Sequence, residues 1–133
     1  MTDQFELDPM RRAIRLLGQA ADWPSAASAL YALEVRWQAP ARGLLIEGRE
    51  ATLQQLQSDA SLFAAGDQVV LRRTLAGDRV IDETATSFVV PEGGIAGLDL
   101  PTGCCVELTR TRVLRFAAGL IVDELNVETW TRL

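Results

Sequence analysis

The chain has 133 residues, of which 48% are apolar and 23% are charged, a balance typical of one globular domain over residues 1–133. Its net charge is −5 and no basic run is present, which argues against binding to nucleic acid or to an anionic membrane. All 13 basic residues are arginine, so the lack of histidine and lysine excludes Ser–His and Cys–His pairs, Schiff bases and phosphate-loop lysines.

Three helices are expected in the first half of the chain. Asp8-Pro9 is typical of a helix start, because Asp caps a helix and Pro suits its first turn. Asp22-Trp23-Pro24 ends that helix and begins a second, and Gly48 precedes a third helix from Arg49 to Phe63. Apolar residues recur at helical spacing at Met10, Ile14, Leu17 and Ala21, then at Ala26, Leu30 and Leu33, and then at Leu53, Leu56, Ala60 and Phe63.

Strands are expected around the third helix and throughout the second half of the chain. Residues 35–39 alternate in polarity and end at Pro40, and residues 43–46 form a second short strand. The later strands are predicted at 68–75, 79–90, 105–116 and 120–130, with a turn at 76–78 and a Gly- and Pro-rich loop at 91–103. This order predicts an α+β fold with N-terminal helices packed on a strongly curved antiparallel sheet.

The last two strands hold the best candidates for a site. Ala117-Ala118-Gly119 is typical of a three-residue hairpin turn, which sets Phe116 opposite Leu120 and Arg112 opposite Glu124. All even-numbered residues of the hairpin then share one face, apolar near the turn and charged in the middle. This face holds Val106, Leu108, Arg110, Arg112, Leu114, Phe116, Leu120, Val122, Glu124, Asn126, Glu128 and Trp130.

Two pairs of charged residues leave alternatives open. Arg112 and Glu124 form either a polar pair in a pocket or an ordinary cross-strand ion pair, which contributes at most about 1 kcal/mol if exposed. Asp82 and Glu83 are neighbours on a predicted strand, so one of them faces inward. Either is a possible pocket acid, but we prefer to interpret them as a solvated edge.

The sequence indicates no metal, no cofactor and no export. Cys104 and Cys105 are adjacent, so they cannot join distant segments, and we interpret them as reduced thiols. Residues 1–6 do not form a basic stretch followed by an apolar one, and no apolar run reaches the roughly 18–20 residues of a membrane span. We therefore expect a cytoplasmic protein.

Three segments resemble the nuclear transport factor two-like superfamily, whose fold is a cone, and within it the SnoaL-like polyketide cyclase branch. They are EGREATLQQL at 47–56, LPTGCCVEL at 100–108 and RVLRFAAGLIVDEL at 112–125. They are similar to a helix start, a loop before a strand and the closing hairpin of that family, and the resemblance extends from about residue 9 to 130. It implies a conical pocket lined by the even face of the hairpin.

The resemblance also implies a partner. In this superfamily the outer face of the sheet often forms a homodimer, and an apolar patch lies on that face here. The patch consists of Thr111, Val113, Leu125 and Val127.

The family's best-known catalytic residues are not carried over. Where the ketosteroid isomerase branch has a catalytic Asp, an oxyanion-hole Tyr and an oxyanion-hole Asp, this chain has Ala39, Ile14 and Arg112. The limonene epoxide hydrolase branch has Arg and Asp two apart on a strand, but here the strand has Arg110 and Arg112. These replacements argue against both reactions.

The leading hypothesis is a small-molecule pocket that performs acid/base chemistry of the cyclase, isomerase or lyase type on an apolar carbonyl-bearing ligand. Arg112 and Arg110 would polarise the ligand, and Glu124 or Glu128 would move a proton. The other expected ligand-binding residues are Trp37, Tyr31, Asn126, Leu114, Phe116 and Trp130. The alternative is a non-catalytic ligand-binding or homodimerisation module, in which the charged cluster is structural and the aromatic residues only pack.

Overall fold

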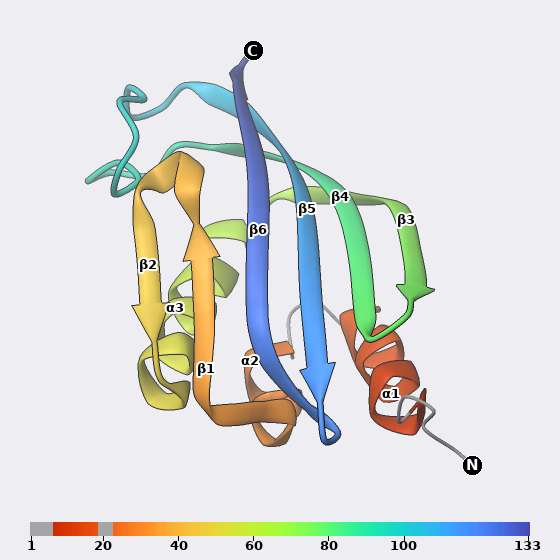
Figure 1. The fold of residues 1–133 in the computed structure, drawn as a ribbon. Helices are drawn as coiled ribbons and strands as arrows, with labels where there is room; N and C mark the ends of the chain where they lie inside the picture. Colours follow the sequence, from red (N-terminus) through yellow and green to blue (C-terminus); the bar gives the residue numbers. More distant parts are fainter. Residues whose placement is uncertain (1–6, 19–22) are drawn as a thin grey trace.

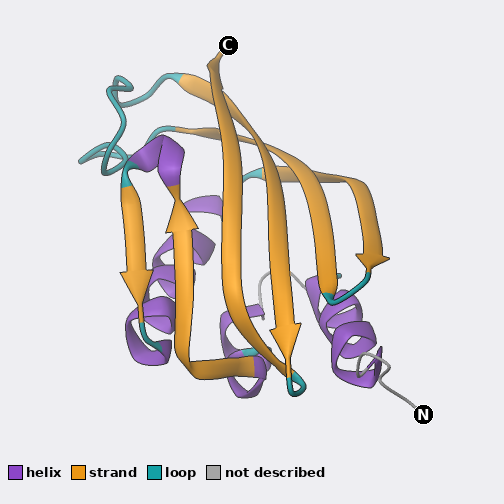
Figure 2. Ribbon diagram, viewed as in Figure 1, coloured by secondary structure: helices purple, strands orange, loops and turns teal. Residues whose placement is uncertain are grey.

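The computed structural model describes residues 7–18 and 23–133, in which helices cover one face of a curved, six-stranded sheet (Figures 1 and 2). The helices are α1 (Leu7–Leu17), α2 (Trp23–Ala26) and α3 (Arg49–Phe63), and a 3-10 turn spans Ser28–Leu30. The predicted α+β class is confirmed. No helix in the described part of the chain is both long and apolar enough to cross a membrane.

The strands follow the predicted order along the chain. They are β1 (Tyr31–Ala39), β2 (Leu44–Glu47), β3 (Asp67–Ala76), β4 (Arg79–Val89), β5 (Cys105–Ala117) and β6 (Leu120–Arg132). In space their order is β2-β1-β6-β5-β4-β3. The sheet is mixed, because β1 runs parallel to β6 while all the other pairs in the described sheet are antiparallel.

The helix predictions are confirmed in two places and wrong in one. The third helix has the predicted bounds, and Asp8-Pro9 lies in the first turn of α1. The second helix is much shorter than expected, because the chain enters β1 at Tyr31. Leu33, predicted on a buried helical stripe, lies on β1 and is 76% exposed. Pairing of β1 with β6 overrides the weak helical periodicity there, and Ala21 and Asp22 lie outside the described residues.

The hairpin register differs from the prediction by two residues, which leaves the predicted faces unchanged for most of its length. The turn has two residues, Ala118 and Gly119, both with positive φ, so Ala117 pairs with Leu120. Val122 has no partner on β5 and forms a bulge. Because of this bulge Ile121 enters the core, in place of the predicted Leu120 and Val122.

Two hydrophobic clusters support the sheet. The larger lies between the helices and the turn end of the sheet, and contains Met10, Ala13, Leu17, Trp23, Ala27, Leu30, Tyr31, Val35, Trp37, Ala39, Leu56, Val80, Leu114, Phe116 and Ile121. The smaller contains Phe88, Val90, Ile95, Val106 and Leu108, with Phe63 and Trp130 packed against it. Between the two clusters lie the buried polar groups on the inner face.

Replacing Ala118 with asparagine tests the turn. Ala118 has a φ of 52°, where a side chain other than that of Asn or Asp is strained, and Asn-Gly is the preferred pair for this type of turn. Ala118→Asn should therefore raise the free energy of unfolding by about 0.5–1 kcal/mol in urea melts. Ala117→Asn, one residue earlier in the strand, is the control and should not stabilise. Equal or lower stability of Ala118→Asn would contradict the turn geometry.

Candidate functional site

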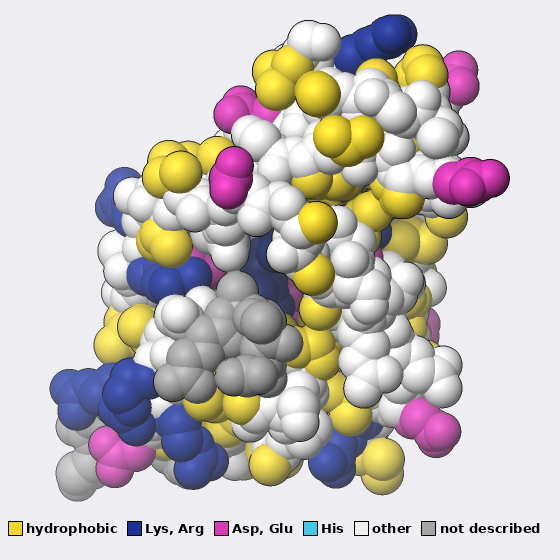
Figure 3. Space-filling model, turned by 180° about the vertical axis from the view of Figure 1, so that it is seen from behind, with side chains coloured by type: hydrophobic (Ala, Val, Ile, Leu, Met, Phe, Trp, Pro, Cys, Tyr) yellow, Lys and Arg dark blue, Asp and Glu magenta, His cyan; other side chains and the backbone are white. Residues whose placement is uncertain are grey.

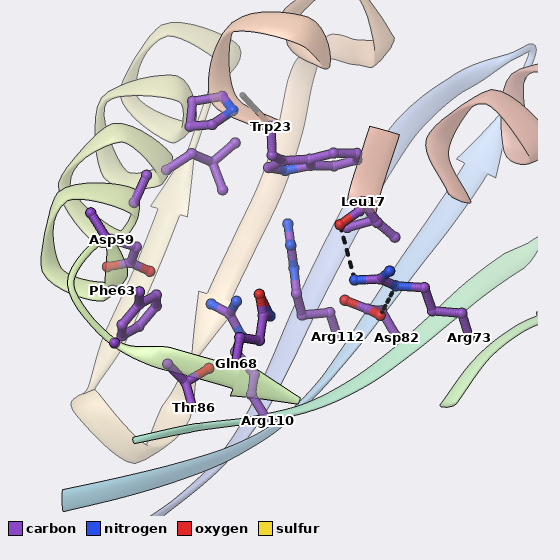
Figure 4. Close-up of a pocket in the computed structure, with 15 residues that line it drawn as sticks. Leu17, Trp23, Asp59, Phe63, Gln68, Arg73, Asp82, Thr86, Arg110 and Arg112 are labelled. Carbon is purple, nitrogen blue, oxygen red and sulfur yellow. Dashed lines mark hydrogen bonds and ion pairs between the residues drawn. The ribbon is translucent and has the colours of Figure 1, made fainter. Parts of the chain in front are cut away.

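A cavity of about 210 Å³ opens on the helix side of the sheet. Its apolar wall comes from the helices and the segment after α3, and its polar wall comes from β3, β4 and β5. The lining residues are Leu17, Trp23, Pro24, Leu56, Asp59, Ala60, Phe63, Ala64, Gly66, Gln68, Arg73, Asp82, Thr86, Arg110 and Arg112. The view from the helix side shows basic side chains deep in a hollow between apolar ones (Figure 3). The close-up shows both walls (Figure 4).

Glu124 lies at the centre of a sealed hydrogen-bond network behind the cavity. Its Oε1 accepts a hydrogen bond from the hydroxyl of Tyr31 at 2.5 Å. Its Oε2 accepts from Trp37 Nε1 at 3.0 Å, and from Arg112 Nε and Asn126 Nδ2 at 3.2 Å each. The residue is only 1% exposed. Both oxygens are therefore engaged, and neither faces the cavity.

Tyr31 is held in its neutral form by this network. Burial, and next the neighbouring charge of Glu124, raise the pKa of the phenol well above its ordinary value. Trp23 packs edge-on against the ring, with the two ring centroids 6.3 Å apart. The hydroxyl of Tyr31 therefore donates a hydrogen bond to Glu124 and is not available to a ligand.

A second network surrounds Arg42, which follows β1 in the turn Pro40–Arg42. Its guanidinium donates two hydrogen bonds to Asp59 at 2.9 and 3.0 Å, and two to Glu128 at 2.9 and 2.7 Å. The cation also lies near the rings of Trp37 and Trp130, at 5.7 and 5.9 Å from their centroids. Although burial opposes the charge, the bonds to the two carboxylates hold the pKa of Arg42 above its ordinary value.

Asp82 is the carboxylate best placed to meet a ligand. It is 2% exposed, it lines the cavity, and its Oδ1 accepts a hydrogen bond from Arg73 Nε at 2.6 Å. Arg73 is fixed in turn by Leu17, whose carbonyl accepts from Nη2 at 2.9 Å. Figure 4 shows the Asp82 carboxylate between the side chains of Arg73 and Arg112. Its interpretation as part of a solvated edge is wrong, because strand alternation points it inward; Glu83 faces outward and is half-buried.

Arg110 lines the cavity and has no ion-pair partner among the described residues. No side-chain hydrogen bond or ion pair to Arg110 exists within residues 7–18 and 23–133, and its Nε is buried and unbonded. Its guanidinium lies 5.1 Å from the ring centroid of Phe63. Burial, and next the like charge of Arg112, lower the pKa of Arg110 to about 10.

The structure separates the predicted site residues into two groups. Arg110 and Arg112 line the cavity. The others do not: Glu124, Tyr31, Trp37 and Asn126 form the first network, Glu128 and Trp130 adjoin Arg42, and Leu114 and Phe116 are in the larger hydrophobic cluster. Arg112 and Glu124 are in contact, although their direct cross-strand partners are Asn126 and Leu114.

Several residues at the site were not found in the sequence. Asp59 lies on the buried face of α3 with Thr52 and Leu56, so its position on an apolar stripe was a usable signal. Arg42 follows a predicted strand that ends at a proline, and the neighbouring sequence contains no pattern that predicts its burial. Within the described residues, no three or more acidic or cysteine side chains gather in a way that would hold a metal ion.

No protein-family model and no curated protein matches the sequence, but solved structures do match the fold. A candidate SnoaL-like polyketide cyclase from Jannaschia sp. CCS1 is similar with a TM-score of 0.70 and 18% identity, over 96% of this chain and 90% of that one. A steroid delta-isomerase from Pseudomonas aeruginosa gives 0.67 and 18%, over 94% and 82%. A protein from Catenulispora acidiphila with a ketosteroid isomerase-like fold, solved with trimethylamine, gives 0.56 and 21%, over 84% and 82%.

These likenesses establish the fold class. The chain has the cone-shaped nuclear transport factor two-like fold, shared with SnoaL-like and ketosteroid isomerase-like proteins, as the sequence resemblance predicted. At these identities the comparison carries the fold alone, because one fold supports many reactions.

Removing the hydroxyl of Tyr31 should change the response of stability to alkaline pH. The folded-state pKa of Tyr31 is raised, so its contribution is full below the unfolded value of about 10 and is lost as the pH rises further, at about 1.4 kcal/mol per pH unit. Tyr31→Phe should lack this loss, and should be about 1–2 kcal/mol less stable at neutral pH because one hydrogen bond to Glu124 is gone.

Urea melts of both proteins between neutral and alkaline pH measure this difference. Tyr31 is the only tyrosine, so phenolate absorbance in the near ultraviolet reports its ionisation alone. The other ionisable groups are the same in both proteins and cancel in the comparison. Parallel pH curves for the two proteins would contradict the neutral, hydrogen-bonded phenol.

Proposed function

We propose that the protein binds a small carbonyl-bearing molecule in the cavity and catalyses proton transfer on it, in a reaction of the cyclase, isomerase or lyase type. The observation that carries this proposal is that a carboxylate, Asp82, and two guanidinium groups, Arg110 and Arg112, line one cavity with an apolar opposite wall. A base and a group that stabilises an enolate are the two requirements for removing a proton next to a carbonyl.

Asp82 is the proposed acid/base group. Arg73 engages only one of its oxygens in the described contacts, and the residue faces the cavity. Glu124 and Glu128, the bases expected from the sequence, are less suitable because each has both oxygens engaged and neither lines the cavity. The geometry therefore favours Asp82 on β4 as the acid/base group over Glu124 and Glu128 on β6.

Arg112 is the proposed polarising group. Glu124 fixes its Nε side at 3.2 Å, and its guanidinium carbon lies 5.0 Å from the ring centroid of Trp23. These contacts hold the cation at the cavity wall before a ligand arrives, so little reorganisation is required during the reaction.

The solved neighbours support this type of chemistry without specifying it. The fold is shared with a candidate polyketide cyclase and a steroid delta-isomerase, and one neighbour was solved with a small molecule, trimethylamine. Ala39 and Ile14 replace the residues that the isomerase branch uses, so the proposed site relies on a different strand.

A non-catalytic binding module is the second candidate function. It is favoured by the salt bridge of 2.6 Å between Arg73 and Asp82, because a carboxylate committed to an ion pair serves the scaffold as readily as a reaction. The two candidates differ in one measurable property, which is the turnover of a bound carbonyl compound.

Exchange of α-protons with D₂O tests catalysis directly. We expect wild-type protein to accelerate exchange in at least one member of a panel of small aromatic and cyclic ketones, followed by proton NMR. Asp82→Asn should slow that exchange by about 10²–10⁴-fold while the ketone still binds.

Glu83→Gln is the matched control, since Glu83 is the neighbouring carboxylate on the outer face of β4, and it should leave the rate unchanged. Ketones that bind without faster exchange would support the binding module. An Asp82→Asn variant with full activity would exclude Asp82 as the base.

We also propose that two copies associate through the outer face of the sheet. Ile81, Val113 and Leu125 are aligned in one row across β4, β5 and β6, and Val127 beside them is 54% exposed. A contiguous apolar surface on a sheet is a frequent protein–protein interface.

The two free thiols, Cys104 and Cys105, support the expected cytoplasmic location.

Replacing Val127 with arginine should produce monomers in sedimentation velocity if this face is the interface, because each copy would place a charge on the apolar contact. Val70→Arg is the control, since Val70 is 47% exposed but on the inner face of β3, and it should stay dimeric. A monomeric wild-type protein, or a dimeric Val127→Arg variant, would contradict this interface.

A further inference from the structure

We propose that the ligand is an anion, a small carboxylate with an apolar body, and that Arg110 is the residue that binds the carboxylate. This inference rests on the proposed function, because it names the class of molecule that the same cavity takes. It is carried by the contacts of the inward-facing arginines and by the composition of the cavity walls.

Arg110 differs from the other arginines of the interior in having no acceptor in the described part of the chain. Arg42 is paired with Asp59 and Glu128, Arg73 with Asp82, and Arg112 with Glu124. A guanidinium has five N–H donors, and those of Arg110 meet no acceptor among the described residues. The side chain is half-buried, and its Nε is sealed from solvent and unbonded. A ligand that brings acceptors explains its position.

The natural partner of Arg110 within the sheet is committed elsewhere. Glu128 lies directly opposite it on β6, but Oε1 of Glu128 accepts from Arg42 and Trp130, and Oε2 accepts from Arg42. On its other side Arg110 pairs with Thr84, which carries no charge. The guanidinium is therefore left for the cavity, which it reaches across the ring of Phe63.

The position of Arg112 favours a negative ligand over a neutral one. Arg110 and Arg112 are two apart on β5, so their side chains leave the same face of the strand, and both line the cavity (Figure 4). Their mutual repulsion is part of what makes the charge of Arg110 unfavourable. An anion bound beside Arg110 removes that repulsion, and a carboxylate matches the fork of a guanidinium with two parallel hydrogen bonds.

The remaining lining requires that the anion carry an apolar part. Opposite β5, the cavity is bounded by Trp23, Pro24, Leu56, Ala60 and Phe63, and by Asp59, whose two oxygens accept from Arg42. Its volume of about 210 Å³ suits a molecule the size of a substituted benzene. An inorganic anion would leave this wall without contacts. The chemistry that fits both the cavity and the proposed proton transfer is therefore a keto acid with an aryl or short alkyl body.

Phenylacetate and phenylacetamide are suitable probes, because they have the same shape and differ in charge. By isothermal titration calorimetry we expect phenylacetate to bind wild-type protein at least about tenfold more tightly. Arg110→Gln should abolish this preference and leave the affinity for the amide within about twofold. Arg110→Lys should keep a reduced preference, and Arg115→Gln, which alters an outer-face arginine paired with Asp123, should change nothing.

The melting temperature gives a second readout, which a structural role would move in the opposite direction. Without ligand, Arg110→Gln should melt at the same temperature as the wild type or up to about 5 °C higher, because the change removes no hydrogen bond to a described residue and relieves the repulsion from Arg112. A variant that unfolds or melts lower would give Arg110 a structural role and contradict the inference.

The binding outcomes separate the two proposals. Equal affinity for the two probes, or a preference that survives Arg110→Gln, would overturn the anion inference while the cavity remains a binding site. If neither probe binds while a ketone of the panel still exchanges, this inference fails and the proposed function stands; if the ketones do not bind either, both fail.

Discussion

The carboxylate of Glu124 is the group on which the arrangement of the sheet depends. Its four donors come from three strands, with Tyr31 and Trp37 on β1, Arg112 on β5 and Asn126 on β6 itself. The parallel β1–β6 pair is where two antiparallel halves of the sheet meet, and this one ion holds both halves. A buried charge is tolerated only while its counter-charge stays in place, since losing Arg112 would leave Glu124 without an opposite charge, at a cost of about 3–5 kcal/mol. Register and curvature are thereby specified together.

The need to pair buried charges separates the polar residues of the interior into those that stabilise the fold and those that line the cavity. Glu124 and Glu128, which hold the fold, have both oxygens engaged and do not line the cavity, whereas Asp82 and Arg110 do. Ion pairs in the interior are thus poor indicators of a site by themselves. The more informative feature is a charged group whose hydrogen-bonding capacity the protein leaves unused.

The sequence predicted the fold well because the fold is encoded in periodicity. Alternation along β4, β5 and β6 determined the inner face even though the hairpin register was wrong by two residues, because a shift of two preserves the face. The site was harder to predict, because it depends on which carboxylate reaches which arginine. That choice was decided by a bulge at Val122 and by Arg42, which comes from a distant turn and takes both oxygens of Glu128.

The Arg42 network also fixes one wall of the cavity more firmly than the other. By joining Asp59 on α3 to Glu128 on β6, Arg42 fixes the helical wall to the middle of the sheet. The opposite wall includes β3, which pairs with β4 alone and carries a bulge between Val70 and Arg72. A bulkier molecule would therefore be accommodated by displacing the edge strand, while the helix stays in place. Enlarging the range of accepted molecules by design would begin at β3, which lies at the edge of the sheet.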